Sequence, residues 1–220
     1  MAYRRTPAVQ ARLDAQREAV LLAAVELLSE RGYGGCSMAA VAHRAGIATG
    51  SMYQHFAGKA ELSVELFRLT VGRELAAVAE AVTRESTPHR RMAAIVETFA
   101  ARALKAPRLA YALLAEPADA VVDAERLVFR QAFRDLFAAQ ISEALADGQL
   151  PPQEPALTAA ALVGAVGEAL VGPLAAGGSH PDDIIPALVS FTLRALGEPD
   201  RGPSRRAPAP TELPPNRGEG

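Results

Sequence analysis

Glycine and proline divide this chain into segments whose apolar residues recur at helical spacing. In residues 11–31, for example, Leu13, Val20, Ala24, Leu27 and Leu28 follow one another at steps typical of one face of an α-helix. No segment alternates apolar and polar residues for long, and runs of β-branched residues are missing. We therefore predict an all-α fold.

The breaks between these segments predict where the helices end. The first helix ends at the Gly-Tyr-Gly-Gly stretch 32–35, because glycine accepts the left-handed conformation that closes a helix. Ser37 is the predicted N-cap of the second helix, which runs to about Ala45, and Thr49 that of a third, short helix that ends near Phe56. The remaining helices are predicted over about 58–82, 88–105, 107–116, 118–147, 154–175 and 182–196.

The two ends of the chain have a different composition. Residues 1–10 are predicted to form a short flexible arm. Residues 198–220 contain six prolines and three glycines and bury too little apolar surface to order, so they are predicted to be disordered. Between them we predict two helical domains, the first over 11–57 and the second over 58–197.

Composition and charge limit the function. The single cysteine, Cys36, excludes an intramolecular disulfide and a cysteine-based zinc cluster, and it is expected to be an apolar filler rather than a thiol switch. No apolar run approaches the roughly 20 residues of a membrane span, and the N-terminus lacks the apolar core of a secretory signal, so we expect a cytoplasmic protein. Residues 1–60 carry seven basic and four acidic side chains, whereas residues 61–197 carry twelve and seventeen. This imbalance fits a nucleic-acid-facing module on an acidic body, although ordinary scatter explains it equally well.

The most informative segment is 37–59, which reads SMAAVAHRAGIATGSMYQHFAGK. Two short helices joined by a turn at Gly46 form the helix-turn-helix unit, which lays its second helix into the major groove of DNA. Met52 and Phe56 lie one turn apart and are expected to face inward, leaving Ser51, Gln54 and His55 on the opposite side with Tyr53 beside them. A plain helical hairpin with a solvated polar face is the alternative.

Each exposed residue of this segment has a chemical role that it can fill. The amide of Gln54 can read a base edge, with adenine favoured by geometry. Hydroxyl and imidazole groups of Thr49, Ser51, Tyr53 and His55 can bond phosphates, which fixes register without reading sequence. Gly50 lets the backbone approach DNA, and Lys59 adds a charge that neutralises phosphate.

The segment resembles the DNA-binding domain of the TetR (tetracycline-repressor-like) family. The resemblance rests on the long first helix ending in Gly-Tyr-Gly, on SMAAVAHRAGIATGSMYQHF, and on the Gly-Lys-Ala-Glu-Leu that opens the fourth helix; Tyr53-x-His55-Phe56 followed by Lys59 is its most specific part. Similarity is close over about residues 12–66, and the later helices are compatible to about residue 196. Ala39 and Ala40 depart from the family pattern, where polar side chains are common, so the second helix is expected to make fewer contacts. The resemblance implies DNA contacts at Ser37, Thr49, Gly50, Ser51, Tyr53, Gln54, His55 and Lys59.

The resemblance also implies a helical effector domain, in which ligand binding reorients the fourth helix. Large apolar side chains on three helices of the body suit a pocket for a small apolar or aromatic molecule. The predicted lining residues are Phe99, Tyr111, Leu114, Phe129 and Phe133. Tyr111, Glu116 and Arg130 are the possible polar partners of the ligand. Aromatic residues at helical spacing are more often plain core, and that alternative stays open.

Residues 156–176 are dense in alanine and glycine, so this helix can pack closely on nearly every side. With residues 184–196 it would form half of a four-helix bundle across a two-fold axis, although burial within one monomer is as compatible with the sequence. The family resemblance favours the homodimer, and a two-fold dimer predicts a palindromic operator.

We find no glycine-rich phosphate loop, metal-ligand cluster or nucleophile motif, so we expect neither an enzyme nor a bound cofactor or metal. The predicted function is a sequence-specific transcriptional regulator, a repressor that releases double-stranded operator DNA when a small, largely apolar ligand binds. A ligand-binding helical module without DNA binding, and a ligand-dependent activator, are the alternatives. The sequence identifies neither the effector nor the operator.

Overall fold

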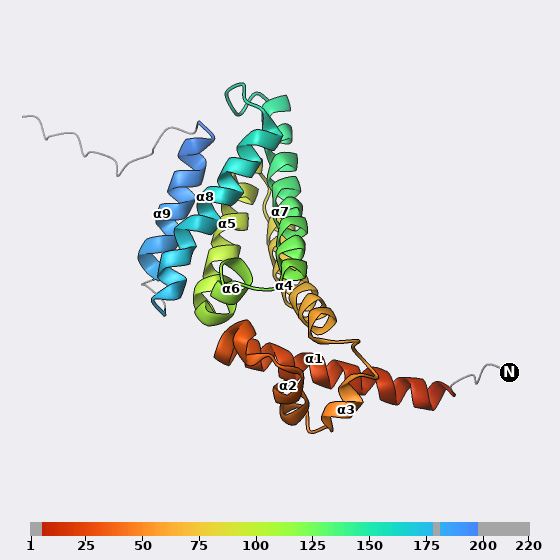
Figure 1. Cartoon of the computed structure of the whole chain (residues 1–220). Helices are drawn as coiled ribbons and strands as arrows, with labels where there is room; N and C mark the ends of the chain where they lie inside the picture. The colour runs from red at the N-terminus through yellow and green to blue at the C-terminus, as the bar shows by residue number, and fades with distance from the viewer. Residues whose placement is uncertain (1–5, 178–180, 198–220) are drawn as a thin grey trace, which may run out of the picture.

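The computed structural model describes residues 6–177 and 181–197, and these residues form nine α-helices and no strand (Figure 1). The predicted all-α fold is confirmed. The helices are α1 (Pro7–Gly35), α2 (Met38–Arg44), α3 (Thr49–Met52), α4 (Lys59–Thr83), α5 (Pro88–Lys105), α6 (Pro107–Leu114), α7 (Ala120–Ala146), α8 (Pro155–Ala175) and α9 (Pro181–Ala195). The predicted tail 198–220 and residues 1–5 of the predicted arm lie outside the described residues.

Local capping explains several of the helix starts. The Ser37 hydroxyl accepts the N–H of Ala40 at 3.1 Å, as predicted, and Thr87 caps α5 in the same way just before Pro88. At the N-terminus, Thr6 accepts the N–H of Val9 and Pro7 occupies the first helical position. Residues 7–10 are therefore helical, and the prediction of a flexible arm up to residue 10 is wrong for them, because it overlooked this Thr-Pro start.

A kink divides α1 near its end. Gly32 has φ 66° and ψ −168°, a conformation that almost only glycine adopts, and a short helical turn follows it to Gly35. The predicted stop of the first helix at this glycine is confirmed. Gly46, in the turn after α2, also has a positive φ, of 69°, as its predicted role in the turn requires.

The helices form a head and a body. Helices α1 to α3 make the head, with α2 and α3 on the side of α1 that faces away from the body, and α4 runs from the head into the bundle of α4 to α9 (Figure 1). Within the body α4 packs against α5 and α7, α7 against α8, and α5 against α9. α6 lies on α1 and is the part of the body that rests on the head.

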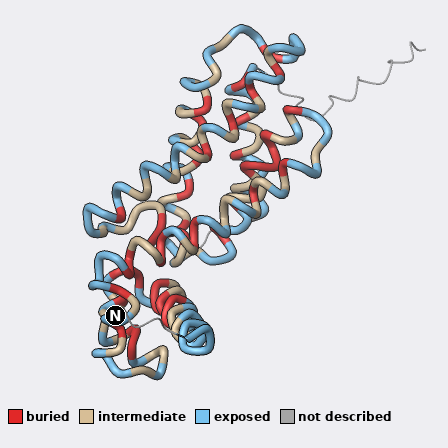
Figure 2. Tube along the Cα trace, turned by 90° about the vertical axis from the view of Figure 1, so that its right-hand side faces the viewer, coloured by how far each residue is buried: buried red, intermediate tan, exposed pale blue. Residues whose placement is uncertain are grey.

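Buried residues gather in two clusters, one in the head and one in the body (Figure 2). The head cluster includes Leu28, Met52, Phe56 and Leu66, and it continues into the body through Ala112, Leu113 and Val122. Phe129 packs against both clusters, and its ring meets that of Phe67 edge-on at 6.3 Å. The head is therefore joined to the body by apolar contacts as well as by the continuous helix α4.

Helix α8 is apolar around most of its circumference. Leu162, Val166 and Leu170 are buried against the bundle, whereas Leu157 is 70% exposed. By length and composition alone this helix is apolar enough to cross a membrane, so the prediction that no segment reaches that threshold is wrong. Its many alanines raise hydropathy without bulk, and a core helix of a soluble protein meets the same criterion.

Candidate nucleic-acid interface and ligand cavity

The second helix of the helix-turn-helix is shorter than predicted. α3 spans Thr49–Met52, and residues 53–55 continue as turns in which Gln54 and His55 donate their N–H groups to the carbonyls of Ser51 and Met52. Its N-cap is Ala48, which has no side chain able to cap, so the predicted cap at Thr49 is wrong. Thr49 is instead the first helical residue and its side chain is exposed.

Most of the predicted DNA contacts are exposed on the head. Tyr53 is 59% exposed, and Thr49, Gly50, Gln54 and Lys59 are exposed beside it, while Ser51 is half-buried. Met52 and Phe56 are buried, as predicted, and anchor α3 in the head core. Ser37 is exposed too, although its hydroxyl already accepts the capping hydrogen bond from Ala40.

His55 does not share this outward face. Its Nε2 lies 3.2 Å from Oε1 of Gln16 in α1, and the residue is half-buried. The prediction that His55 points outward with Gln54 is therefore wrong, because the shortened helix turns residue 55 back toward α1. Next to it, the guanidinium of Arg17 lies 5.0 Å from the centre of the Phe56 ring and pairs with Glu65 at 3.0 Å. No local motif in the sequence marks Gln16 or Arg17 as supports of α3.

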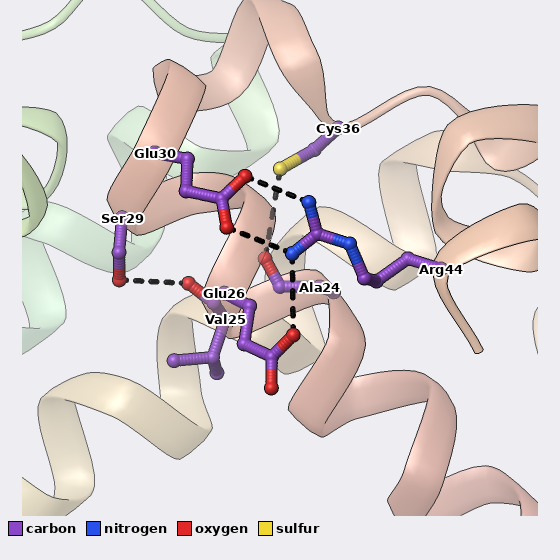
Figure 3. Close-up of polar contacts among 7 residues, drawn as sticks. All are labelled: Ala24, Val25, Glu26, Ser29, Glu30, Cys36 and Arg44. Atoms are coloured by element: carbon purple, nitrogen blue, oxygen red, sulfur yellow. Dashed lines mark hydrogen bonds and ion pairs between the residues drawn. The ribbon is translucent and has the colours of Figure 1, made fainter.

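A fork of ion pairs braces α2 against α1 (Figure 3). Both terminal nitrogens of Arg44 donate to the carboxylate of Glu30, at 2.9 and 2.7 Å, and one of them also reaches Glu26 at 3.2 Å. Hydrogen bonding to Arg44 lowers the pKa of the Glu30 carboxyl below its usual value. The two-point geometry fixes the angle of α2 on α1, and so the position of the turn that carries α3.

Cys36 lies behind this brace in the head core. It is 1% exposed, and its Sγ lies 3.7 Å from the carbonyl oxygen of Ala24, a contact also drawn in Figure 3. Burial raises the pKa of the thiol to about 11, so it stays protonated at neutral pH. The thiol therefore fills the core as expected.

The body contains a cavity of about 490 Å³ between α5, α7 and α8. Its walls are apolar, and its lining includes one basic residue, Arg130, and one acidic residue, Glu168. Three phenylalanines interlock at its wall: Phe133 contacts Phe99 with ring centres 5.2 Å apart and Phe129 with ring centres 4.9 Å apart, both edge-on. Such a volume with few polar groups suits a small, mainly apolar molecule.

The structure brings together four of the five residues predicted to contact a ligand. Phe99, Leu114, Phe129 and Phe133 line the cavity, whereas Tyr111 does not and packs against the body core instead. Of the predicted polar partners, Arg130 lines the cavity and the Glu116 carboxylate turns to the head.

Sequence reasoning missed the wall contributed by α8. Val163, Gly164 and Gly167 line the cavity together with Glu168. The alanine and glycine density of this helix predicts close packing, either against a second subunit or within one monomer, and does not predict a cavity wall. A glycine that opens space for a ligand has the same sequence signature, so the pattern alone does not separate the two roles.

The head is thus a helix-turn-helix domain with an exposed polar second helix, carried on a helical body with an apolar cavity. Residues 20–66 match the family described as "Bacterial regulatory proteins, tetR family", and the resemblance seen in the sequence is confirmed. The matched stretch holds the helix-turn-helix and the start of α4.

Two relatives resemble the chain over a limited stretch. One is the HTH-type transcriptional activator FasR of Mycolicibacterium smegmatis, which is 34% identical over 86 residues, or 39% of each chain. The other is the fatty acid metabolism regulator protein of Bacillus subtilis, 27% identical over 77 residues, which cover 35% of this chain and 40% of the relative. The matched stretches span about two fifths of the length of these relatives.

Solved structures resemble the whole fold. The fatty acid degradation regulator FadR from Bacillus halodurans superimposes with a TM-score of 0.71 at 16% identity, covering 89% of this chain and 97% of that one. FadR from Bacillus subtilis in complex with stearoyl-CoA also gives 0.71, at 17% identity and 82% and 97% coverage. At such identities the likeness establishes the fold alone.

Proposed function

We propose that this protein is a DNA-binding transcriptional regulator whose affinity for its operator changes when a largely apolar small molecule binds the body. The observation that carries the proposal is the presence, in one chain, of an exposed polar helix-turn-helix and an apolar cavity. In this proposal residues 11–57 bind DNA and residues 58–197 bind the effector and the second subunit. The protein works in the cytoplasm and has no enzymatic role.

The proposed DNA contacts are Ser37, Thr49, Gly50, Ser51, Tyr53, Gln54, His55 and Lys59. Support for Thr49, Gly50, Tyr53, Gln54 and Lys59 comes from their common exposure around α3. Gln54 is proposed to read one base pair, and Tyr53 and Lys59 to contact phosphates. His55 is proposed to bond a phosphate through the ring nitrogen that does not contact Gln16.

The proposed effector is a molecule with an apolar body and one polar end, bound by Phe99, Leu114, Phe129 and Phe133. The apolar walls favour the hydrocarbon part, and Arg130 offers a positive charge at the lining. The structural neighbour that contains stearoyl-CoA suggests the first compound to test, a long-chain acyl-CoA. Tyr111, predicted to contact the ligand, has no such support because it is absent from the lining.

The proposed active form is a homodimer that binds a palindromic operator. The face of α8 turned away from the bundle includes the exposed residues Leu157 and Ala161, and Phe191 of α9 is 42% exposed. Apolar exposure of this kind on two successive helices favours burial against a second copy. Repression released by the ligand is the proposed direction of control, and ligand-dependent activation is the second candidate because one relative is a transcriptional activator.

The first test is recovery of genomic DNA fragments by the purified protein at two salt concentrations. We expect an imperfect palindrome, bound by a dimer and lost as salt rises, because phosphate contacts release counterions. Gln54→Ala should then relax preference at one base pair, whereas Lys59→Ala should weaken binding at all sequences and lower the salt dependence. Recovery of no sequence above background would reject the DNA-binding function and favour a ligand-binding module.

The second test fills the cavity from α8. A Cβ built at Gly167, a residue of the cavity lining, meets no atom within 4 Å beyond the neighbouring residues of its own helix, so Gly167→Leu should occupy ligand space without breaking the fold. Gly72→Leu is the matched control, because Gly72 is also an unobstructed helical glycine and lies in α4, away from this cavity. We expect stearoyl-CoA to change operator affinity in the control and not in Gly167→Leu; equal responses in both would reject this cavity as the effector site.

A further inference from the structure

A carboxylate of the body sits on the kink of the first helix of the head. Glu116, just after α6, accepts the N–H of Tyr33 at 3.0 Å through its Oε1, across 83 residues of sequence. The kink places Gly32 directly under this carboxylate: a Cβ at residue 32 would lie 2.3 Å from Oε2 and 2.4 Å from Oε1. The contact between Glu116 and the kink thus needs glycine at residue 32, both because of the backbone angles there and because a side chain would occupy the space of the carboxylate.

The segment that carries Glu116 is held in place by Arg126 of α7. Its guanidinium donates to the carbonyls of Ala112, Leu113 and Glu116 at 2.8, 3.0 and 2.6 Å. A fourth bond, at 2.6 Å, joins it to Asp123. These donors satisfy carbonyls that the end of α6 leaves without a helical partner, and the Arg126 side chain is only 12% exposed. The end of α6 and the residue after it therefore move as one piece.

The same segment forms part of the cavity wall. Leu114 and Ala115 line the cavity, and Glu116 is the next residue. A ligand that displaces the backbone at Leu114 or Ala115 would therefore act on the position of Glu116 over Tyr33. A directional hydrogen bond is lost over a shift of less than an ångström or two, while the apolar contacts around it persist.

We propose that Glu116 is a positioning residue that latches the head to the body, and that occupancy of the cavity acts on the head by releasing or re-seating this latch. The proposal rests on the proposed function for the identity of the ligand and adds the route by which it acts. In this route the signal reaches the head through α6 and the kink of α1. The sequence-based expectation was that the fourth helix carries it.

The experiment uses the full chain with three substitutions. Glu116→Ala removes the latch, and Glu116→Gln keeps a carbonyl oxygen that can accept the Tyr33 N–H. Glu143→Ala is the matched control, because it removes a body carboxylate that pairs with Arg91 at 2.6 Å, far along the chain from the head. Spin labels at E18C and A139C, both exposed positions in α1 and α7, report the distance between head and body; Cys36 is buried and stays unlabelled.

Two readouts need no ligand. Exchange of the Tyr33 amide hydrogen should become about 10- to 100-fold faster in Glu116→Ala, the range expected when a hydrogen bond to a charged acceptor is lost. The distribution of head–body distances should broaden in the same variant, stay narrow in Glu116→Gln, and match the parent protein in Glu143→Ala. A Glu116→Ala protein with unchanged exchange and an unchanged distance distribution would overturn the latch, whatever the ligand does.

The third readout is the ratio of operator affinities with and without stearoyl-CoA. We expect this ratio to fall toward 1 in Glu116→Ala, to be restored in part by Glu116→Gln, and to be unaffected by Glu143→Ala. A full parental ratio in Glu116→Ala would overturn the proposed route. If the parent protein itself shows no response to stearoyl-CoA while the distances still broaden in Glu116→Ala, the effector assignment fails and the latch stands.

Discussion

Replacing Gly32 by alanine tests whether the Glu116 carboxylate occupies the space over this glycine. The quantity measured is the free energy of unfolding. The new residue must adopt φ 66° and ψ −168°, which costs about 1–3 kcal/mol for a residue with a Cβ. Its Cβ would also lie 2.3 Å from the Glu116 carboxylate, which must move away and give up its bond to Tyr33. That loss adds about 1.5–3 kcal/mol, so Gly32→Ala should lower the free energy of unfolding by about 2.5–6 kcal/mol.

The two contributions separate in a double-mutant cycle. In a Glu116→Ala background the carboxylate is already gone, and Gly32→Ala should cost only the backbone strain of about 1–3 kcal/mol. Urea unfolding followed by circular dichroism, at one fixed protein concentration, gives all four values. Gly34→Ala is the control, because a Cβ there meets nothing within 4 Å and the backbone has no positive φ; it should be neutral or slightly stabilising.

An additive cycle would refute this reasoning. If Gly32→Ala costs the same in both backgrounds to within about 0.5 kcal/mol, the carboxylate does not occupy the space over Gly32. If Gly34→Ala lowers the free energy of unfolding as much as Gly32→Ala does, the effect comes from general helix disruption and is not specific to the kink.

Three further predictions concern the two cores and the brace. The urea midpoint should fall more steeply between pH 9 and about 11 in the parent protein than in Cys36→Ala. Burial raises the pKa of the Cys36 thiol to about 11 in the folded protein, so the thiol of the unfolded chain ionises at lower pH and the folded state loses stability over this range. Arg44 lowers the pKa of Glu30, so the ion pair contributes to stability above the usual carboxyl pKa and this contribution is lost as Glu30 becomes protonated. The difference in urea midpoint between the parent protein and Arg44→Met should therefore narrow as the pH falls below about 4.5. Phe133→Ala should lower the free energy of unfolding, measured with urea, by about 3 kcal/mol. This is the low end for phenylalanine, because one side of the ring already borders the cavity. A loss below about 1 kcal/mol would contradict the ring packing.

Helix existence and most helix ends were predictable because they depend on nearby residues. The caps at Ser37 and Thr87 and the glycines at 32 and 46 act within one turn of the chain, so composition and spacing reveal them. The early start of α1 at Pro7 has the same local origin and was missed only because apolar periodicity is weak there.

Errors in the candidate site have a different origin, since they depend on contacts distant in sequence. The sequence places His55 on the outward face only if α3 continues to Phe56; the helix ends at Met52, and Gln16 holds the ring from 39 residues away. The cavity shows the same limit. Aromatic residues of α5 to α7 suggested a pocket, but nothing local distinguishes Tyr111, which lies in the core, from Phe129, which lies at the lining.

Phe129 and Glu116 show why the cavity can control the head although most of the joint is apolar. Phe129 lines the cavity and packs on Phe67 of α4, so a ligand bears on the joint between head and body at this ring as well. Apolar contact is non-directional, however, and tolerates sliding at little cost in free energy. The Glu116 bond to Tyr33 is directional and admits one register of α6 on α1. In the proposed mechanism the apolar contacts therefore keep head and body together, and the Glu116 carboxylate selects the orientation that they adopt.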